Sequence, residues 1–145
     1  MARDPLGAVR TIRERAVDRL RRDLAACLAA EAAVAARIAE LDRAVQRDRA
    51  AHGAVEDPHR FQDMFAARRA AGEADRVAAV REHLQAAVRS EDVRAALVAA
   101  RVAAEAVGAV IAERATARAI ALGRREQLEL EEAARSRKRS MASGC

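Results

Sequence analysis

Aromatic side chains are almost absent from this chain, whose 145 residues include no Trp, no Tyr and only two Phe. Proline and glycine are also scarce, with two and six copies respectively. Aromatic residues bury the most area per side chain in a core, and glycine and proline mark the turns between strands. These absences exclude a thick globular core and a sandwich, barrel or doubly wound sheet.

Cysteine and long apolar runs are scarce as well. Cys27 and Cys145 are the only cysteines, which is too few for a disulfide framework. The first residues lack the apolar core of a signal peptide. The apolar stretch over residues 102–122 is interrupted by four charged side chains, Glu105, Glu113, Arg114 and Arg118. We therefore expect a cytoplasmic chain that spans no membrane.

Alanine is abundant, at 41 of the 145 residues, and Arg, Leu and Glu are also frequent. All four are strong helix formers, and such a composition is typical of long helices and coiled coils. The predicted fold class is all-α, an elongated two-helix antiparallel coiled-coil hairpin that forms a single domain over residues 1–145.

Apolar side chains recur at helical spacing over residues 8–51, which predicts the first helix. Within it, one stripe advances in alternating steps of four and three, the heptad spacing of a left-handed coiled coil. A charged residue, Glu31, interrupts this stripe of otherwise apolar side chains. The stripe consists of Cys27, Glu31, Val34, Ile38, Leu41 and Val45.

The turn region is predicted over residues 52–72. The chain reverses over 53–58, and residues 59–71 form a helical turn or two that can continue into the second helix, with a weak second interruption at Ala71-Gly72. Gly53 suits the left-handed position that ends a helix, and Asp57 followed by Pro58 suits the start of the next one. Both aromatic residues of the chain, Phe61 and Phe65, lie in this region. They form either a local core or an exposed adhesive tip, and the sequence leaves both interpretations open.

The second helix is predicted over residues 73–135, followed by a flexible basic tail over 136–145. Ser90 and the two acids after it resemble a helix start, which favours a kink there. Leu84 is expected, like Leu41 in the first helix, to lie on the seam between the helices. The predicted stripe of the second helix comprises Val77, Val80, Leu84, Val88, Leu97 or Val98, Val102, Ile111 and Leu122.

The net charge of +5 is concentrated at the C-terminal end, where residues 135–139 hold four basic side chains and no acid. The rest of the chain mixes both signs almost equally, whereas a protein that follows nucleic acid phosphates carries a basic stripe. We therefore expect no nucleic acid partner.

Recognisable catalytic and metal-binding patterns are missing. His52, His59 and His83 have no cysteine or paired carboxylate at metal-ligand spacing. There is no nucleophile elbow and no glycine-rich phosphate loop, and a two-helix hairpin is expected to offer no water-excluding pocket. The sequence predicts a non-enzymatic protein with no metal and no cofactor.

Two segments carry a resemblance to a known family. Residues 124–134 read Arg-Arg-Glu-Gln-x-Glu-x-x-Glu-x-Ala, which resembles the C-terminal signature of the flagellar type III export stalk family, FliJ and its injectisome relative YscO. Residues 9–16 look like that family's opening helix. Length, the two-helix plan, a turn near the middle and a basic C-terminal end also agree.

The resemblance implies a stalk that inserts its joined ends into a hexameric flagellar export ATPase. Its other end would engage the membrane protein of the export gate, and the chain would escort substrate chaperones at the inner face of the cell membrane. The ATPase-facing set implied in this way is Arg124, Arg125, Glu126, Gln127, Glu129 and Glu132. The set implied to face the gate or another partner is Leu41, Val45, Phe61 and Phe65.

Two other functions stay open from the sequence. Apolar residues on the part of the second helix that outruns the first could join two copies, which is typical of a homodimerising structural or adaptor coiled coil. The basic tail could associate with nucleic acid, which the neutral body of the chain makes the weaker alternative.

Overall fold

Two long helices make up nearly all of the computed structural model, which describes residues 5–142. Helix α1 spans Pro5–Gly53, the short 3-10 helix η1 spans Pro58–Phe61, and helix α2 spans Gln62–Ala142. Residues 5–142 contain no strand. The predicted all-α helical hairpin is therefore confirmed.

The contacts within the chain divide it into two units, and each is described by itself. The turn unit is the hairpin over residues 15–100, which contains η1 and the turn. The terminal unit combines residues 5–14 of α1 with residues 101–142 of α2.

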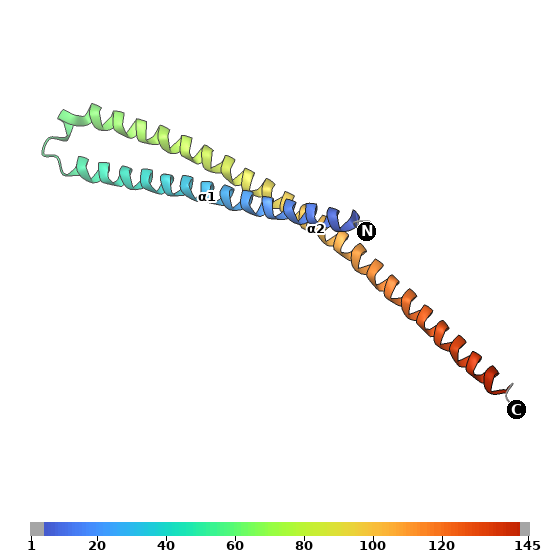
Figure 1. Ribbon diagram of the computed structural model, residues 1–145. Helices are drawn as coiled ribbons and strands as arrows, with labels where there is room; N and C mark the ends of the chain where they lie inside the picture. The colour runs from blue at the N-terminus through green and yellow to red at the C-terminus, as the bar shows by residue number, and fades with distance from the viewer. Residues whose placement is uncertain (1–4, 143–145) are drawn as a thin grey trace. The chain divides into compact units, whose positions relative to one another are not determined.

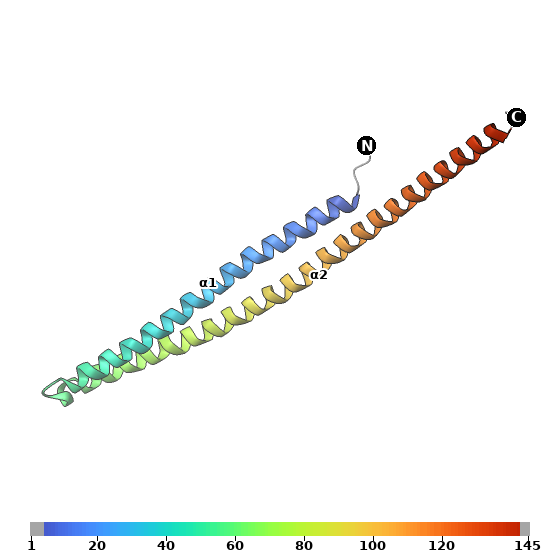
Figure 2. The same cartoon turned by 90° about the horizontal axis from the view of Figure 1, so that it is seen from below.

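In the turn unit α1 and α2 lie side by side and antiparallel, joined through η1 (Figures 1 and 2). The half-buried side chains of α1 follow the predicted alternation of four and three residues, from Leu24 through Cys27 and Glu31 to His52. This spacing keeps one stripe of a helix in continuous contact with its partner. The seam predicted for α1 is thus confirmed, with Leu41 and Val45 on it.

Ion pairs between the helices show the register of the hairpin. Arg68 pairs with Asp48 at 3.0 Å, Arg76 with Asp42 at 2.7 Å and Arg37 with Glu82 at 3.2 Å. Successive pairs step back along α1 as they advance along α2, as expected for antiparallel helices. These side chains are about half exposed, so each pair contributes at most about 1 kcal/mol and serves mainly to select the alignment.

The charged residue in the α1 stripe has a partner on the opposite helix. The Oγ atom of Ser90 lies 2.8 Å from Oε2 of Glu31 and 2.9 Å from the carbonyl oxygen of Ala87. Its hydroxyl donates to these two acceptors, and Ser90 is almost completely buried. The helix continues through Ser90 without a break. Of the residues that resembled a helix start, Ser90 is therefore part of the seam, whereas Glu91 and Asp92 are exposed.

The predicted stripe of α2 is confirmed in part, since Leu97 is buried and Val80 and Ile111 are half-buried. The buried side chains of α2 are Phe65, Ala79, Ala86, Ser90 and Leu97, and three of these five are small. The prediction of Leu84 as a seam residue is wrong, because its side chain is 61% exposed. Val77, Val88, Val98 and Val102 are exposed as well. Small residues occupy most buried positions of α2 because they let two helix backbones approach closely. The exposed leucine and valines lie on other faces of α2.

The boundaries of the helices also differ from the prediction. Gly53 remains in α1 and no described glycine has a positive φ; instead the N–H of Ala54 donates to the carbonyl of Ala51 at 3.2 Å. Asp57 makes no side-chain cap, although η1 does begin at Pro58. The reversal precedes η1 as predicted, and the helical turns predicted over 59–71 are η1 and the start of α2. Helix α2 begins at Gln62 rather than near residue 73, and Ala71-Gly72 does not interrupt it.

The predicted flexible tail is helical as far as Ala142, and Cys145 lies outside the described residues. Arg139 stands in the last turn of α2, where a cation is favourable next to the negative end of the helix dipole. The basic residues at the end of the chain therefore suit a helix terminus.

The terminal unit has a short buried stripe followed by a long exposed segment. On α2 its half-buried positions are Ala103, Ala104, Val107, Gly108 and Ile111. Every residue from 112 to 142 is exposed. We call residues 112–142 the C-terminal segment; its exposed apolar residues include Ile120, Leu122, Leu128 and Leu130. The sequence pattern also predicted Val107 and Ile111 to lack a partner on the first helix, but both are half-buried.

One helix is long and apolar enough to cross a membrane by length and composition. An 18-residue window within His59–Ala142 has a mean hydropathy of 1.8, and 6% of it is buried. The sequence prediction of no membrane span rested on the charged residues in the same region. Length and composition are the only criteria that the helix meets, and a helix of a soluble protein can meet both.

His83, on the α2 seam, is expected to lower the stability of the hairpin. His83 lies at a heptad position between Ala79 and Ala86, and its Nδ1 atom is buried with no hydrogen-bond partner among the described residues. An unsatisfied buried polar atom costs about 1–3 kcal/mol. We expect His83→Leu to raise the melting temperature measured by circular dichroism. His59→Leu, at an exposed site in the turn, is the control; a lower melting temperature for His83→Leu alone would contradict this assignment.

Candidate functional site

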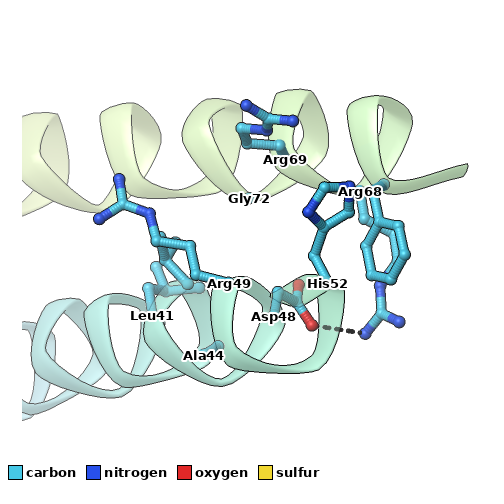
Figure 3. A pocket seen from close by; sticks show the side chains of 10 residues that line it. Leu41, Ala44, Asp48, Arg49, His52, Arg68, Arg69 and Gly72 are labelled. Carbon is cyan, nitrogen blue, oxygen red and sulfur yellow. Dashed lines mark ion pairs between the residues drawn. The ribbon is translucent and has the colours of Figure 1, made fainter. Parts of the chain in front are cut away.

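A pocket lies between the two helices of the turn unit, close to the turn (Figure 3). Its volume is about 260 Å³. The two-helix plan led us to expect no water-excluding pocket, and a cavity at this position was not predicted. We call this cavity the turn-end pocket; it is lined by Leu41, Ala44, Val45, Asp48, Arg49, His52, Phe65, Arg68, Arg69 and Gly72.

Three of the four residues predicted to face a partner at this end come together in the pocket. Leu41 and Val45 reach it from the seam of α1, and Phe65 reaches it from the first turns of α2. Phe61 does not line it. Phe65 is 9% exposed and belongs to a local core, whereas Phe61 is 39% exposed and fits an exposed tip. Each of the two interpretations left open by the sequence therefore applies to one of the two residues.

The pocket exists because one layer of the seam lacks a side chain. Gly72 stands seven residues after the buried Phe65 and seven before the buried Ala79, which is the heptad repeat of the seam. A Cβ atom placed on Gly72 would meet nothing within 4 Å. Ala44 from α1 lines the same space with only a methyl group. The missing side-chain volume in this layer leaves the gap.

The wall nearest the turn is formed by two rings. The imidazole of His52 and the ring of Phe65 meet edge to face, with centroids 4.6 Å apart and planes at 88°. Such a geometry is favourable because the positive edge of one ring meets the negative face of the other. The pair closes the pocket on the side of the turn.

The rim of the pocket is positively charged. Three arginines line it, and only Arg68 is neutralised there, by Asp48 at 3.0 Å. Arg49 on α1 and Arg69 on α2 form no hydrogen bond or ion pair with any described residue. The pocket thus combines an apolar interior with two uncompensated guanidinium groups, one from each helix.

Arginines of the preceding turns of α1 are already engaged. Arg47 donates to Glu40 at 2.7 Å and Arg43 donates to it at 2.9 Å. These two hydrogen bonds and charges hold the pKa of Glu40 below its usual range. The local surplus of positive charge is therefore concentrated at Arg49 and Arg69.

Sequence reasoning missed Gly72, Arg49 and Arg69. A signal for Gly72 was present, because a glycine at a heptad position is a gap in a seam. No such signal marks the two arginines, since the chain holds many arginines and only the fold shows which of them lack a partner.

The residues predicted to face an ATPase lie in the C-terminal segment. Arg124, Arg125, Glu126, Gln127, Glu129 and Glu132 are all helical and exposed. Gln127 donates to Glu131 at 3.4 Å, but Arg124 and Arg125 pair with no described acid. The alternative in which these arginines are satisfied along their own helix therefore has no support in the geometry.

The described residues form no candidate metal site. Over residues 5–142 no three of the His, Cys, Asp and Glu side chains lie together as a metal site would require. No protein-family model, no curated protein and no solved structure matches this chain. Its function is therefore argued from its own residues.

Proposed function

We propose that this protein is a non-enzymatic coupling stalk of a flagellar type III protein export apparatus. In this proposal the C-terminal segment inserts into a hexameric export ATPase, and the turn end contacts the membrane protein of the export gate. The chain works in the cytoplasm at the inner face of the membrane and escorts substrate chaperones. Both the resemblance over residues 124–134 and the helical hairpin support it.

The observation that carries the proposal is the exposure of the C-terminal segment and of its two arginines. It is a helix with every residue exposed, and its charged motif at Arg124 and Arg125 is unpaired. Adjacent residues on an α-helix point about 100° apart, so the two guanidinium groups can meet different subunits of a surrounding ring. Apolar residues without an internal partner, such as Leu128 and Leu130, add contact area for such a ring.

The test reverses the two unpaired charges. We expect Arg124→Glu/Arg125→Glu to weaken binding to the cognate hexameric ATPase at least about tenfold, because like charges across an interface cost several kcal/mol. The measurement is biolayer interferometry with immobilised stalk protein. Because both residues are exposed, the melting temperature should stay the same.

The matched control is Arg19→Glu/Arg22→Glu, which makes the same charge change at exposed positions of α1 outside the C-terminal segment. It should retain most of the binding. Equal affinity of the wild type and the Arg124→Glu/Arg125→Glu variant would refute the stalk mechanism in this form.

A homodimerising adaptor is the second candidate, favoured by the exposed apolar residues of α2. Ile120, Leu122 and Leu128 project from the C-terminal segment without cover. A second copy could bury them, because an unpartnered apolar stripe marks an interaction site. Sedimentation velocity separates the two functions: the stalk is a monomer at micromolar concentration, and the adaptor is a stable dimer without any ATPase.

A further inference from the structure

We propose that the turn-end pocket binds an acidic peptide segment of a protein partner, with one apolar side chain entering the space above Gly72. Carboxylates on either side of that side chain would pair separately with Arg49 and with Arg69 at the rim. The inference deepens the proposed function at the turn end and rests on it only for the partner being a protein.

The interior of the pocket determines the apolar part of the ligand. Leu41, Val45 and Phe65 supply an apolar floor and wall, and the gap at Gly72 has no side chain of its own. Its volume of about 260 Å³ is below the roughly 300–1,000 Å³ of small-molecule sites. A single inserted side chain with part of its backbone fits this volume, and burying it gives the apolar half of the binding energy.

The rim of the pocket determines the charged part of the ligand. Arg49 and Arg69 come from opposite helices and have no partner within the described chain, whereas Arg68 is paired with Asp48. The guanidinium fork matches the two oxygens of a carboxylate, and such charge-assisted hydrogen bonds are about twice as strong as neutral ones. Acids beside the inserted side chain therefore compensate the unpaired charges, while the apolar side chain itself fills the gap.

The charge of the turn favours a peptide over an anionic membrane. Residues 50–67 hold three carboxylates, those of Glu56, Asp57 and Asp63, and one arginine, Arg60, whose guanidinium carbon lies 5.9 Å from the ring centroid of the exposed Phe61. A negative lipid surface would be repelled by these carboxylates before it reached the pocket. A peptide can present its acid to the pocket rim alone.

The test uses ¹⁵N-labelled full-length protein and the pentapeptide acetyl-Asp-Asp-Phe-Asp-Asp-amide as a probe. We expect chemical shift changes concentrated at the Gly72 amide and at the Nε–H groups of Arg49 and Arg69. The analogue with Asn in place of every Asp should bind at least about tenfold more weakly, since hydrogen bonds to charged groups are worth about 1.5–3 kcal/mol.

Variants separate the charge from the cavity. Arg49→Gln/Arg69→Gln should weaken the probe at least about tenfold, whereas the matched Arg19→Gln/Arg22→Gln, which makes the same charge change at exposed α1 positions, should not. Gly72→Leu fills the gap, so it should abolish the local shifts and raise the melting temperature, because glycine is also a poor helix former.

Three results would overturn the proposal. These are unaltered probe binding by Gly72→Leu, equal binding of the Asp and Asn peptides, or the same shifts with phosphatidylglycerol vesicles, which would assign the site to lipid. ATPase binding is absent from all of these measurements. Failure of the pocket proposal is therefore distinguishable from failure of the stalk proposal, which the C-terminal segment tests separately.

Discussion

Replacing Leu97 by Asp is expected to destabilise the hairpin by about 3–5 kcal/mol, a large part of the roughly 5–15 kcal/mol that stabilises a typical domain. Leu97 is 5% exposed and is the largest aliphatic side chain among the buried residues of α2. The substitution removes its apolar contacts and introduces a carboxylate with no cation at the seam. Urea unfolding followed by circular dichroism measures the loss.

Leu84→Asp is the matched control for this substitution. It makes the same chemical change in the same helix, but Leu84 is 61% exposed. We expect a change within about 0.5 kcal/mol, as for other surface substitutions. Equal losses at the two positions would mean that Leu84 lies on the seam, as the sequence pattern alone predicted.

The second large effect is expected at the polar pair in the seam. Ser90→Ala leaves the half-buried carboxylate of Glu31 without its cross-helix donor, which should cost about 1–3 kcal/mol. Replacing both residues, in Glu31→Leu/Ser90→Ala, should restore or exceed the wild-type stability, because paired polar groups in a seam are often no better than apolar ones. The single and double variants form a double-mutant cycle in urea.

Ser136→Ala is the control for the serine. The hydroxyl of Ser136 also donates to a backbone carbonyl, that of Glu132 at 2.9 Å, but the residue is exposed and has no partner on α1. This variant should be neutral. A double variant of Glu31 and Ser90 that is less stable than either single one would show that the pair stabilises the hairpin beyond selecting its register.

The sequence predicted α1 well because its seam is built from large apolar residues at regular spacing. Leu24, Ile38 and Leu41 lie on one face of α1, and the other faces of the helix are charged. The heptad spacing is therefore visible in the sequence without a structure. Glu31 looked like a defect because its partner, Ser90, is 59 residues away along the chain. A hydrogen bond between distant residues leaves no trace in a local pattern.

The sequence predicted α2 only in part. Leu97 of the predicted stripe is buried and Val80 is half-buried, but other large residues of that stripe lie off the seam. Leu84 and Val88 are exposed, whereas Ala79 and Ala86 are buried. Hydrophobicity ranks leucine above alanine, but a close approach of two backbones selects the smaller side chain. Alanine is spread over all faces of α2, so its presence at the seam carries no periodic signal.

The candidate site was predicted in part. Leu41, Val45 and Phe65 were assigned to the partner-facing end and lie together in the turn-end pocket. The cavity itself was not predicted, because it results from the alignment of Gly72 with α1, and that alignment is known only once the helices are paired.

The alanine seam has a consequence for how this sequence tolerates change over generations. Ala79 is completely buried, so any larger side chain there must push the helices apart, at a cost of about 1–3 kcal/mol. Leu84 and Val88 face outward and can become polar without disturbing the hairpin. We therefore expect Ala79 to stay fixed over generations while the exposed Leu84 and Val88 vary, whereas the buried Leu97 stays fixed as well.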